Sequence, residues 1–201
     1  MTAQIFLIAS PDVDATSCSR MLDEALAAAP VAALLLPRGK RSDGGYKTLV
    51  KAVTPRAQAA GVAVLIEGDP GLVRMLGVDA VHVEGGIDEV RAATEALKPD
   101  FIVGAGQIVS RHDAMSKGEL GPDYIFFGPL SGARDPEQRD LARWWAEIME
   151  VPSVLSDPAA TAETASSEGS EFIGLGDSVW AAPEGVTARI EAIAKALEAS
   201  P

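Results

Sequence analysis

Residues 62–105 read VAVLIEGDPGLVRMLGVDAVHVEGGIDEVRAATEALKPDFIVGA. This stretch contains three short apolar runs, Val62 to Ile66, Ala80 to Val83 and Phe101 to Ala105, of the kind that forms buried β-strands. Between the second and third runs, Ile87 to Leu97 has apolar residues at helical spacing and is rich in residue types that favour helices. The stretch therefore predicts strands that alternate with helices.

The same alternation extends to both ends of the chain. Five further apolar runs have strand character: Gln4 to Ala9, Val31 to Leu36, Tyr124 to Gly128, Ser153 to Leu155 and Glu171 to Leu175. Four further segments have helical periodicity: Ser19 to Ala28, Tyr46 to Ala60, Arg139 to Met149 and Val186 to Leu197. Eight strands in 201 residues leave about 25 residues for each unit, which is enough for one strand, one helix and two tight loops.

The number of strands decides between two parallel folds. Strands that are apolar on both faces suit a parallel sheet covered by helices. Alternation alone also fits an open, doubly wound sheet, which five or six strands would favour. Eight strands favour a closed (β/α)8 barrel instead. We therefore expect residues 1–201 to form one compact TIM barrel, without a second domain.

Two kinds of connecting segment stand out between the strands and helices. Gly61, Gly77 and Gly121 each precede a strand, at a point where a helix ends and the backbone turns with positive φ. We interpret them as turn residues. The segment Thr161 to Ser170 is rich in Ala, Ser, Thr and Glu, and we predict that it forms a weak seventh helix.

The composition excludes several classes of partner. A formal net charge of -12 repels nucleic-acid phosphates and anionic lipid alike, so we expect no nucleic-acid partner. The first residues do not have the pattern of a signal peptide, and no run approaches the about 20 apolar residues that span a membrane, so we expect a cytoplasmic protein. Cys18 is the only cysteine, which rules out an internal disulfide, and we interpret it as a small buried residue.

In a TIM barrel the active site lies at the carboxyl ends of the strands, so the loops after the predicted strands are where we expect the chemistry. These loops hold most of the unusual residues of the chain. They are Pro37 to Arg41, Glu67 to Asp69, His82 to Gly86, Gly104 to Gln107, Gly128 to Asp135, Ser156 to Pro158 and Gly174 to Ser178.

Three motifs in these regions resemble one known family. Gly77 to Val83 reads GVDAVHV and is similar to "GADGVHL", whereas Gly121 to Pro129 reads GPDYIFFGP and is similar to "GADYVGVGP". Arg38 and Lys40 stand where that family has the basic residues of "QxRxK". On these motifs the chain resembles the thiamine phosphate synthases and their TenI-type thiazole tautomerase relatives, nearly from end to end.

The resemblance implies an enzyme that joins an aminopyrimidine pyrophosphate to a thiazole phosphate and releases pyrophosphate with the help of Mg²⁺. When the pyrophosphate departs, it leaves a pyrimidine carbocation-like species, which the thiazole nitrogen captures. Such a site neutralises an anionic leaving group with Lys, Arg and a metal that carboxylates hold.

The chain departs from the family at most of the positions that this chemistry uses. The Gln of "QxRxK" falls on Leu36, and the Ser after the fifth strand falls on Gly106. Of the Mg²⁺ ligands, the "ND" pair falls on Glu67 and Gly68, and the second aspartate falls on Ile87, with Asp88 one place late. The pyrophosphate-binding "TxTK" falls on Ala133 to Pro136, and the phosphate-binding glycine pair falls on Asp157 and Pro158. Arg38 and Lys40 remain. Asp157 adds a negative charge, Pro158 lacks an N–H group and Asp177 lies nearby, so we expect no phosphate after the seventh and eighth strands.

These considerations give a set of candidate site residues. The candidate ligand-binding residues are Arg38, Lys40, Glu67, His82, Gln107 and Arg134, of which Lys40 and His82 are also the catalytic candidates. Glu67, Asp69 and Asp88 are candidate metal ligands, because acids after adjacent strands could converge, with His82 and Glu84, on a divalent ion. No cofactor follows from the residues themselves, and Mg²⁺ is implied by the resemblance alone.

Each candidate also has a structural interpretation. His82 could support the barrel rather than act as a base, and an acidic protein carries acids in its loops without binding metal. His112 precedes Asp113 at the predicted start of a helix, which suits a solvated position. Trp144 and Trp145 cannot both face inward from one helix, so one of them could mark a contact in a homo-oligomer.

Three functional hypotheses follow. The first is a diverged member of the family that has lost the synthase chemistry and binds a small-molecule ligand or performs another reaction. The second is an active thiamine phosphate synthase in which neighbouring acids substitute for the missing ligands. The third is a non-catalytic protein that binds a partner through its acidic rim and the tryptophan pair.

Overall fold

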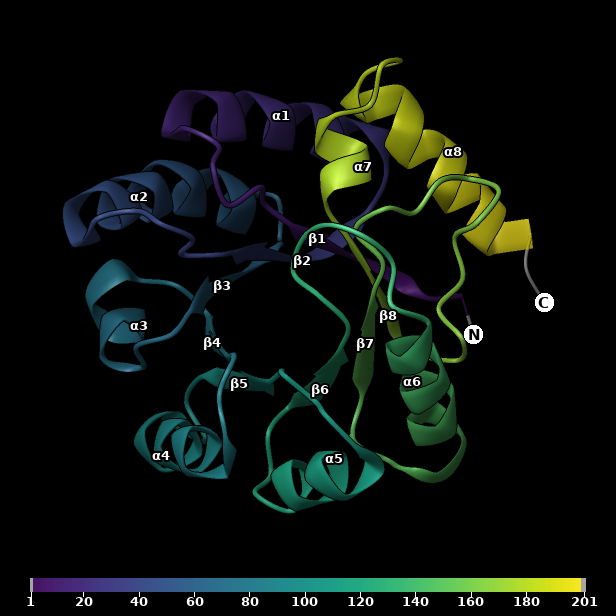
Figure 1. Ribbon diagram of the computed structural model, residues 1–201. Coiled ribbons are helices and arrows are strands. Elements are labelled where there is room, and N and C mark those ends of the chain that lie inside the picture. The colour runs from purple at the N-terminus through teal and green to yellow at the C-terminus, as the bar shows by residue number, and fades with distance from the viewer. Residues whose placement is uncertain (1, 200–201) are drawn as a thin grey trace.

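The computed structural model describes residues 2–199, which form one closed barrel of eight parallel strands surrounded by helices (Figure 1). The strands are β1 (Gln4–Ile8), β2 (Val31–Leu36), β3 (Ala63–Glu67), β4 (Ala80–Val83), β5 (Ile102–Ala105), β6 (Tyr124–Phe127), β7 (Ser153–Ser156) and β8 (Phe172–Leu175). The helices are α1 (Ala15–Ala28), α2 (Asp43–Ala59), α3 (Gly71–Leu76), α4 (Ile87–Leu97), α5 (Arg111–Gly118), α6 (Pro136–Ile148), α7 (Asp177–Trp180) and α8 (Val186–Ala199). The expected (β/α)8 barrel is thus confirmed.

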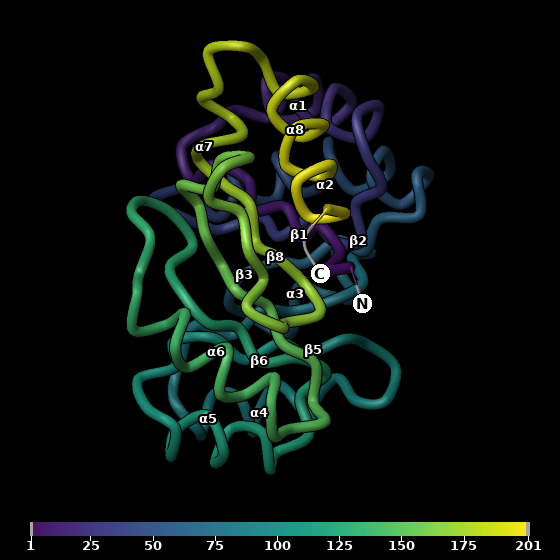
Figure 2. Tube along the Cα trace, turned by 90° about the vertical axis from the view of Figure 1, so that its right-hand side faces the viewer, coloured from purple at the N-terminus to yellow at the C-terminus, as the bar shows by residue number. Residues whose placement is uncertain are grey.

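Each strand pairs with its neighbours in chain order, and β1 closes the barrel by pairing with β8. Helices cover most of the outside of the strands, with α1, α2 and α8 on one side and α4, α5 and α6 on the other, whereas turns form the connection from β7 to β8 (Figures 1 and 2). The strands are apolar on both faces because one face packs against these helices and the other fills the barrel.

Alternate residues of each strand point into the barrel, as the two-residue period of a strand requires. On β1, for example, Phe6 and Ile8 belong to the interior cluster, whereas Ile5 and Leu7 pack against the helices. The interior cluster consists of Phe6, Ile8, Ala33, Leu35, Leu65, Ala80, Tyr124, Phe126 and Val154. These side chains fill the middle of the barrel, so an open site can form only at its ends.

Acidic residues just before alternate strands fasten the amino-terminal end of the barrel. Asp79, before β4, accepts a hydrogen bond of 2.8 Å from the backbone N–H of Val64 on β3. Asp123, before β6, does the same for Val103 on β5, also at 2.8 Å. Glu171, before β8, repeats the contact with the first residue of β7. The aspartates of GVDAVHV and GPDYIFFGP therefore have a structural role in joining neighbouring strands.

The three glycines that we interpreted as turn residues have the expected backbone conformation. Gly61, Gly77 and Gly121 have φ values of 77°, 70° and 75°. These values lie in the left-handed region, which a glycine adopts without the steric cost of a Cβ atom. Each glycine lets the chain leave a helix and enter the next strand.

The predicted helix over Thr161 to Ser170 is wrong, because this segment forms turns between β7 and β8. Its hydroxyl groups bond to nearby backbone in place of a helical ladder; the Thr164 Oγ1, for example, accepts from the N–H of Thr161 at 3.0 Å. Glu168 and Gly169 then take positive φ values of 52° and 92°, which no helix allows. The short helix of this part of the chain, α7, follows β8 instead.

The single cysteine, Cys18, lies among the outer helices. Cys18 lies in α1 and is buried, as expected, and its burial raises the pKa of the thiol to about 11. A thiol with such a pKa is a poor nucleophile at neutral pH, which agrees with a packing role.

Within residues 2–199, none of the helices combines the length and the apolar character that a membrane-spanning segment needs.

Candidate active site

The carboxyl ends of the strands meet at one open end of the barrel, which we call the C-terminal mouth. On β4, Ala80 points into the barrel, so His82 and Glu84 follow it on the inner side at intervals of two residues. On β5, Gly104 and Gly106 occupy the corresponding inner positions beside them. These two glycines leave space that larger neighbours fill.

His82 lies between two polar side chains in this space. Its Nδ1 is 2.9 Å from the hydroxyl of Tyr124 on β6, and its Nε2 is 2.8 Å from Oε1 of Glu84. The His82 side chain is fully buried and stacks parallel to the Tyr124 ring, with 5.8 Å between the centroids. Both ring nitrogens are therefore occupied, and His82 has no free nitrogen to act as a base.

Tyr124 contributes a protonated hydroxyl to this network. Burial, with the nearby charges of Glu84 and Asp123, raises the Tyr124 pKa well above its usual value of 10. The phenol therefore keeps its proton and can donate it to Nδ1 of His82. With Nδ1 as the acceptor, Nε2 is the nitrogen that can donate to Oε1 of Glu84. The group that this network presents at the mouth is Glu84, whose side chain is 25% exposed.

Gly106 is required by the position of Glu84. A Cβ atom on Gly106 would lie 2.0 Å from Oε1 of Glu84 and 2.8 Å from Nε2 of His82. A serine at position 106, as in the resembling family, cannot coexist with Glu84 in this arrangement. The carboxylate of Glu84, after β4, thus takes the space beside Gly106 at the end of β5.

Glu67, a candidate for both ligand and metal binding, ends β3 next to this network. It faces the register partner His82 on β4, and its Oε2 accepts the backbone N–H of Arg38 at 2.7 Å. The hydroxyl of Tyr46 on α2 accepts the N–H of Glu67 and donates to the carbonyl of Leu36. These bonds join the ends of β2 and β3.

The loop after β2 places Arg38 and Lys40 at the edge of the mouth. The guanidinium of Arg38 bonds to Asp43 in the first turn of α2. Lys40 is exposed, and among residues 2–199 it has no hydrogen-bond or ion-pair partner. Arg41 supports the loop from beneath, since it donates to four backbone carbonyls in the loops after β1 and β2. Arg41 has a positioning role that its sequence context did not reveal.

The candidate metal ligands do not converge. Asp69 is exposed and caps the start of α3 by accepting the N–H of Gly71 at 2.8 Å. Asp88 is exposed in the first turn of α4, and one oxygen of Glu67 is engaged by the backbone. No group of three or more His, Cys, Asp or Glu side chains in the described part of the chain could hold a metal ion. The donor set therefore does not fit a protein-held Mg²⁺, and we derive no chemical step through a metal.

Arg134 and Asp157 form an ion pair across the loops after β6 and β7. The Nε and one terminal nitrogen of Arg134 both lie 2.7 Å from Oδ2 of Asp157, which is 1% exposed. Arg139 adds a more distant contact at 4.0 Å. The carboxylate of Asp157, which we expected to repel phosphate, is thus paired with Arg134 through Oδ2, whereas its buried Oδ1 has no hydrogen-bond partner within residues 2–199. Asp177 instead accepts the N–H of Gly132 at 2.7 Å and so joins the loops after β6 and β8.

Gln107 lies after β5 with its side chain exposed and its φ at 51°. Its carbonyl and that of Gly106 each accept a hydrogen bond of 3.0 Å from Nζ of Lys117, which is buried beneath this loop and pairs with Asp113. The loop is therefore fixed from below by Lys117. This role could not be predicted from the sequence, because a lysine on a helix is usually solvated.

The remaining aromatic and histidine candidates lie outside the mouth. Trp145 is buried and donates its Nε1–H to the carbonyl of Val151 at 2.8 Å, whereas Trp144 is partly exposed beneath the guanidinium of Arg111. The expectation that only one tryptophan faces inward is confirmed. His112 is exposed in the first turn of α5, as expected. A homo-oligomer contact at Trp144 remains a prediction.

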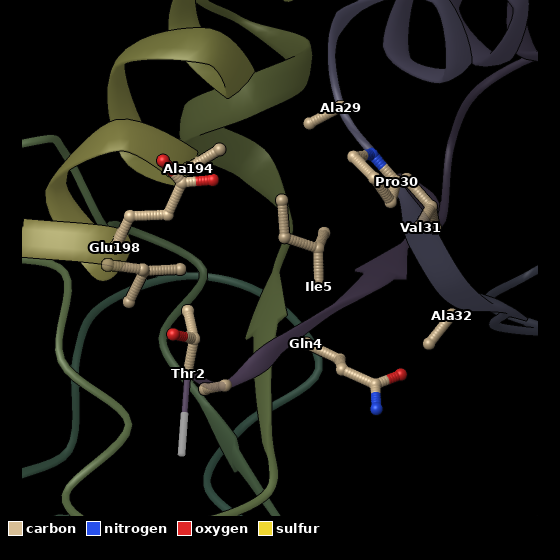
Figure 3. A pocket seen from close by; sticks show the side chains of 11 residues that line it. Thr2, Gln4, Ile5, Ala29, Pro30, Val31, Ala32, Ala194 and Glu198 are labelled. Carbon is tan, nitrogen blue, oxygen red and sulfur yellow. The ribbon is translucent and has the colours of Figure 1, made fainter.

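Cavities also occur at the opposite, amino-terminal end of the barrel. One of about 330 Å³ lies between the start of β1, the α1–β2 connection and the end of α8, and Figure 3 shows its lining. Another of about 390 Å³ is mainly apolar and reaches the underside of Tyr124. Neither cavity is lined by a candidate residue, since the candidates follow the carboxyl ends of the strands.

The protein is a (β/α)8 barrel whose C-terminal mouth carries the network of Tyr124, His82 and Glu84 beside the basic loop after β2. A family model described as thiamine monophosphate synthase matches residues 5–156. Proteins named thiamine-phosphate synthase from Hyphomonas neptunium and Rhodospirillum centenum are 34% and 33% identical, over 94% and 93% of this chain and 91% and 94% of their own lengths. The chain belongs to the thiamine monophosphate synthase family.

A solved structure shows the same fold. Thiamine phosphate pyrophosphorylase from Pyrococcus furiosus superposes with a TM-score of 0.78, and the match covers 98% of this chain and 96% of that one. The two sequences are only 17% identical over this match, so the likeness concerns the barrel itself.

Proposed function

We propose that this chain is a thiamine phosphate synthase, which joins an aminopyrimidine pyrophosphate to a thiazole phosphate and releases pyrophosphate. The observation that carries the proposal is the match to two proteins of that name over more than nine tenths of their lengths. This is the second of the three hypotheses from the sequence. It is better supported than a lost activity, which rested on the replaced motif residues.

The side chains at the mouth support the proposal in two ways. Lys40 is exposed and unpaired among residues 2–199, so its ammonium group can bind the pyrophosphate, and Arg38 stands beside it. The carboxylates of Glu67 and Glu84 lie at the ends of the next two strands. The mouth thus has a cationic side at the β2 loop and an anionic side at β3 and β4, as a substrate with one anionic end would need.

The test is direct synthesis. The purified protein, given both precursors and Mg²⁺, should form thiamine phosphate at about 1 per second or faster, a rate typical of enzymes. Lys40→Ala should lower this rate about a hundredfold, because it removes a contact to the leaving group. Lys51→Ala, which changes an exposed lysine on α2, should leave the rate within twofold of the unchanged protein. A parallel assay with Mn²⁺ covers a change of metal preference.

A second candidate function is binding of a small ligand without turnover. It is favoured by the Arg134–Asp157 pair, because these two residues bond to each other where the family binds anionic groups. Absence of product under all of these conditions would refute the synthase proposal. A rise of the melting temperature with either precursor would then support the binding function, since ligand at 100 times its dissociation constant adds about 2.7 kcal/mol of stability.

A further inference from the structure

We propose that Glu84 binds the amino group of the pyrimidine and stabilises the cation that forms when pyrophosphate departs. The inference rests on the proposed synthase function and assigns a residue to the pyrimidine end of the substrate. It starts from the His82–Glu84 pair and from Gly106, whose lack of a side chain leaves room for the Glu84 carboxylate.

The two carboxylate oxygens of Glu84 have different environments. Oε1 is held by Nε2 of His82 at 2.8 Å, and His82 is in turn held by the hydroxyl of Tyr124. Oε2 has no hydrogen-bond partner among residues 2–199 and is not among the buried atoms that lack one, so it is open to solvent. Glu84 is therefore fixed by one oxygen, and its other oxygen is accessible to a ligand.

The negative charge at the ends of β3 and β4 determines which end of the aminopyrimidine pyrophosphate can bind there. Glu67 ends β3 beside His82, so two carboxylates lie on neighbouring strands. They repel a pyrophosphate and attract a group with N–H donors, such as the amino group of the pyrimidine. The pyrophosphate belongs on the side of Lys40 and Arg38, at the adjacent strand end β2. The ends of β2, β3 and β4 follow one another round the barrel, so one extended substrate can reach both sides.

The same carboxylate acts on the reaction. The bond between the pyrimidine methylene carbon and the pyrophosphate oxygen breaks, and its electron pair leaves with pyrophosphate. The positive charge that remains spreads over the aminopyrimidine, including its amino nitrogen, until the lone pair of the thiazole nitrogen forms the new C–N bond. A fixed carboxylate at the amino group interacts more strongly with this cation than with the neutral ring, so it stabilises the transition state more than the bound substrate.

Glu84→Gln tests the charge while it keeps the shape. The amide oxygen of Gln can still accept the His82 N–H, so the barrel should fold, and the melting temperature checks this. We expect kcat to fall about a hundredfold, with a smaller change in KM for the aminopyrimidine pyrophosphate. Glu95→Gln is the matched control, because Glu95 is an exposed acid farther along α4. Its kcat should stay within twofold of the unchanged protein.

A binding measurement makes the inference independent of turnover. The probe is the alcohol of the aminopyrimidine, which has no phosphate, and its comparison is the analogue with hydrogen in place of the amino group. By calorimetry, Glu84→Gln should weaken binding of the alcohol at least tenfold and leave binding of the analogue unchanged.

The outcomes separate this inference from the synthase proposal. Turnover by the unchanged protein with kcat of Glu84→Gln within threefold of it overturns the role of Glu84 and leaves the synthase proposal intact. Absence of turnover together with Glu84-dependent binding of the alcohol overturns the synthase function and the cation role, and supports the amine site. Absence of both turnover and Glu84-dependent binding overturns both proposals.

Discussion

The pairing of Arg134 with Asp157 gives a stability prediction that can be worked from the structure. Asp157 is 1% exposed, and both close contacts to its Oδ2 come from Arg134. Arg134→Ala leaves this buried carboxylate with Arg139 alone, at 4.0 Å. Breaking a buried ion pair from one side costs about 3 to 5 kcal/mol. We expect about 3 kcal/mol here, because Arg134 itself is 29% exposed and Arg139 remains nearby.

The assay is equilibrium unfolding in urea at pH 7, with the free energy extrapolated to water. Asp157→Asn is the comparison, since it removes the buried charge and leaves an arginine that can turn to solvent. The double variant Arg134→Ala/Asp157→Asn should be more stable than Arg134→Ala alone, because no unpaired charge is left in the interior. This ordering is the signature of an uncompensated carboxylate rather than of lost packing.

Two results would refute the reasoning. If the free energy of unfolding of Arg134→Ala lies within about 0.5 kcal/mol of that of the unchanged protein, the ion pair does not compensate a buried charge. If the double variant is less stable than Arg134→Ala, the loss comes from packing of the arginine stem instead.

Three further predictions concern other parts of the barrel. Burial raises the pKa of Glu168, but hydrogen bonds from two arginines of α6 outweigh this effect and lower the pKa to about 2. The contribution of Glu168 to the free energy of unfolding is therefore present above pH 4.5 and is lost as the pH falls toward 2. Arg139→Ala should therefore flatten the fall in stability measured by urea unfolding between these pH values, and an unchanged slope would contradict the assignment. A thiol reagent at pH 8 should label Cys18 about a hundredfold more slowly in the native than in the unfolded protein, because burial raises the pKa of the thiol from 9.0 to about 11. Rapid labelling of the native protein would show that the thiol is accessible. Gly104→Ala should destabilise the protein by about 3 kcal/mol in thermal unfolding, since the new Cβ would lie 1.9 Å from the buried ring of Tyr124, and a loss below about 1 kcal/mol would mean that the ring can move aside.

The sequence by itself determined the fold and the end of the barrel that carries the site. Eight apolar runs separated by helical segments are sufficient for a closed parallel barrel, because each unit is short and each strand is buried on both faces. The turn glycines and the partly exposed tryptophan could also be predicted, since they depend on local backbone conformation and on helical spacing.

Local patterns were less reliable in polar segments. The segment Thr161 to Ser170 has a composition compatible with a helix, but it has few apolar residues that could pack such a helix against the barrel. Its side-chain hydroxyls compete for the backbone, so turns form instead. A short helix draws most of its stability from the face that it buries, and this segment has no such face.

Only the tertiary structure decided the roles of the polar residues at the mouth. The contact between His82 and Tyr124 joins residues 42 positions apart, and that between Arg134 and Asp157 joins residues 23 apart. Such pairs depend on strand register and on the space that a residue such as Gly106 leaves. Neither property produces a repeating pattern of residues from which it could be predicted. The energy of a buried charge depends on the group that faces it, so the sequence could name the acids and bases of this barrel, whereas their partners followed from its closure.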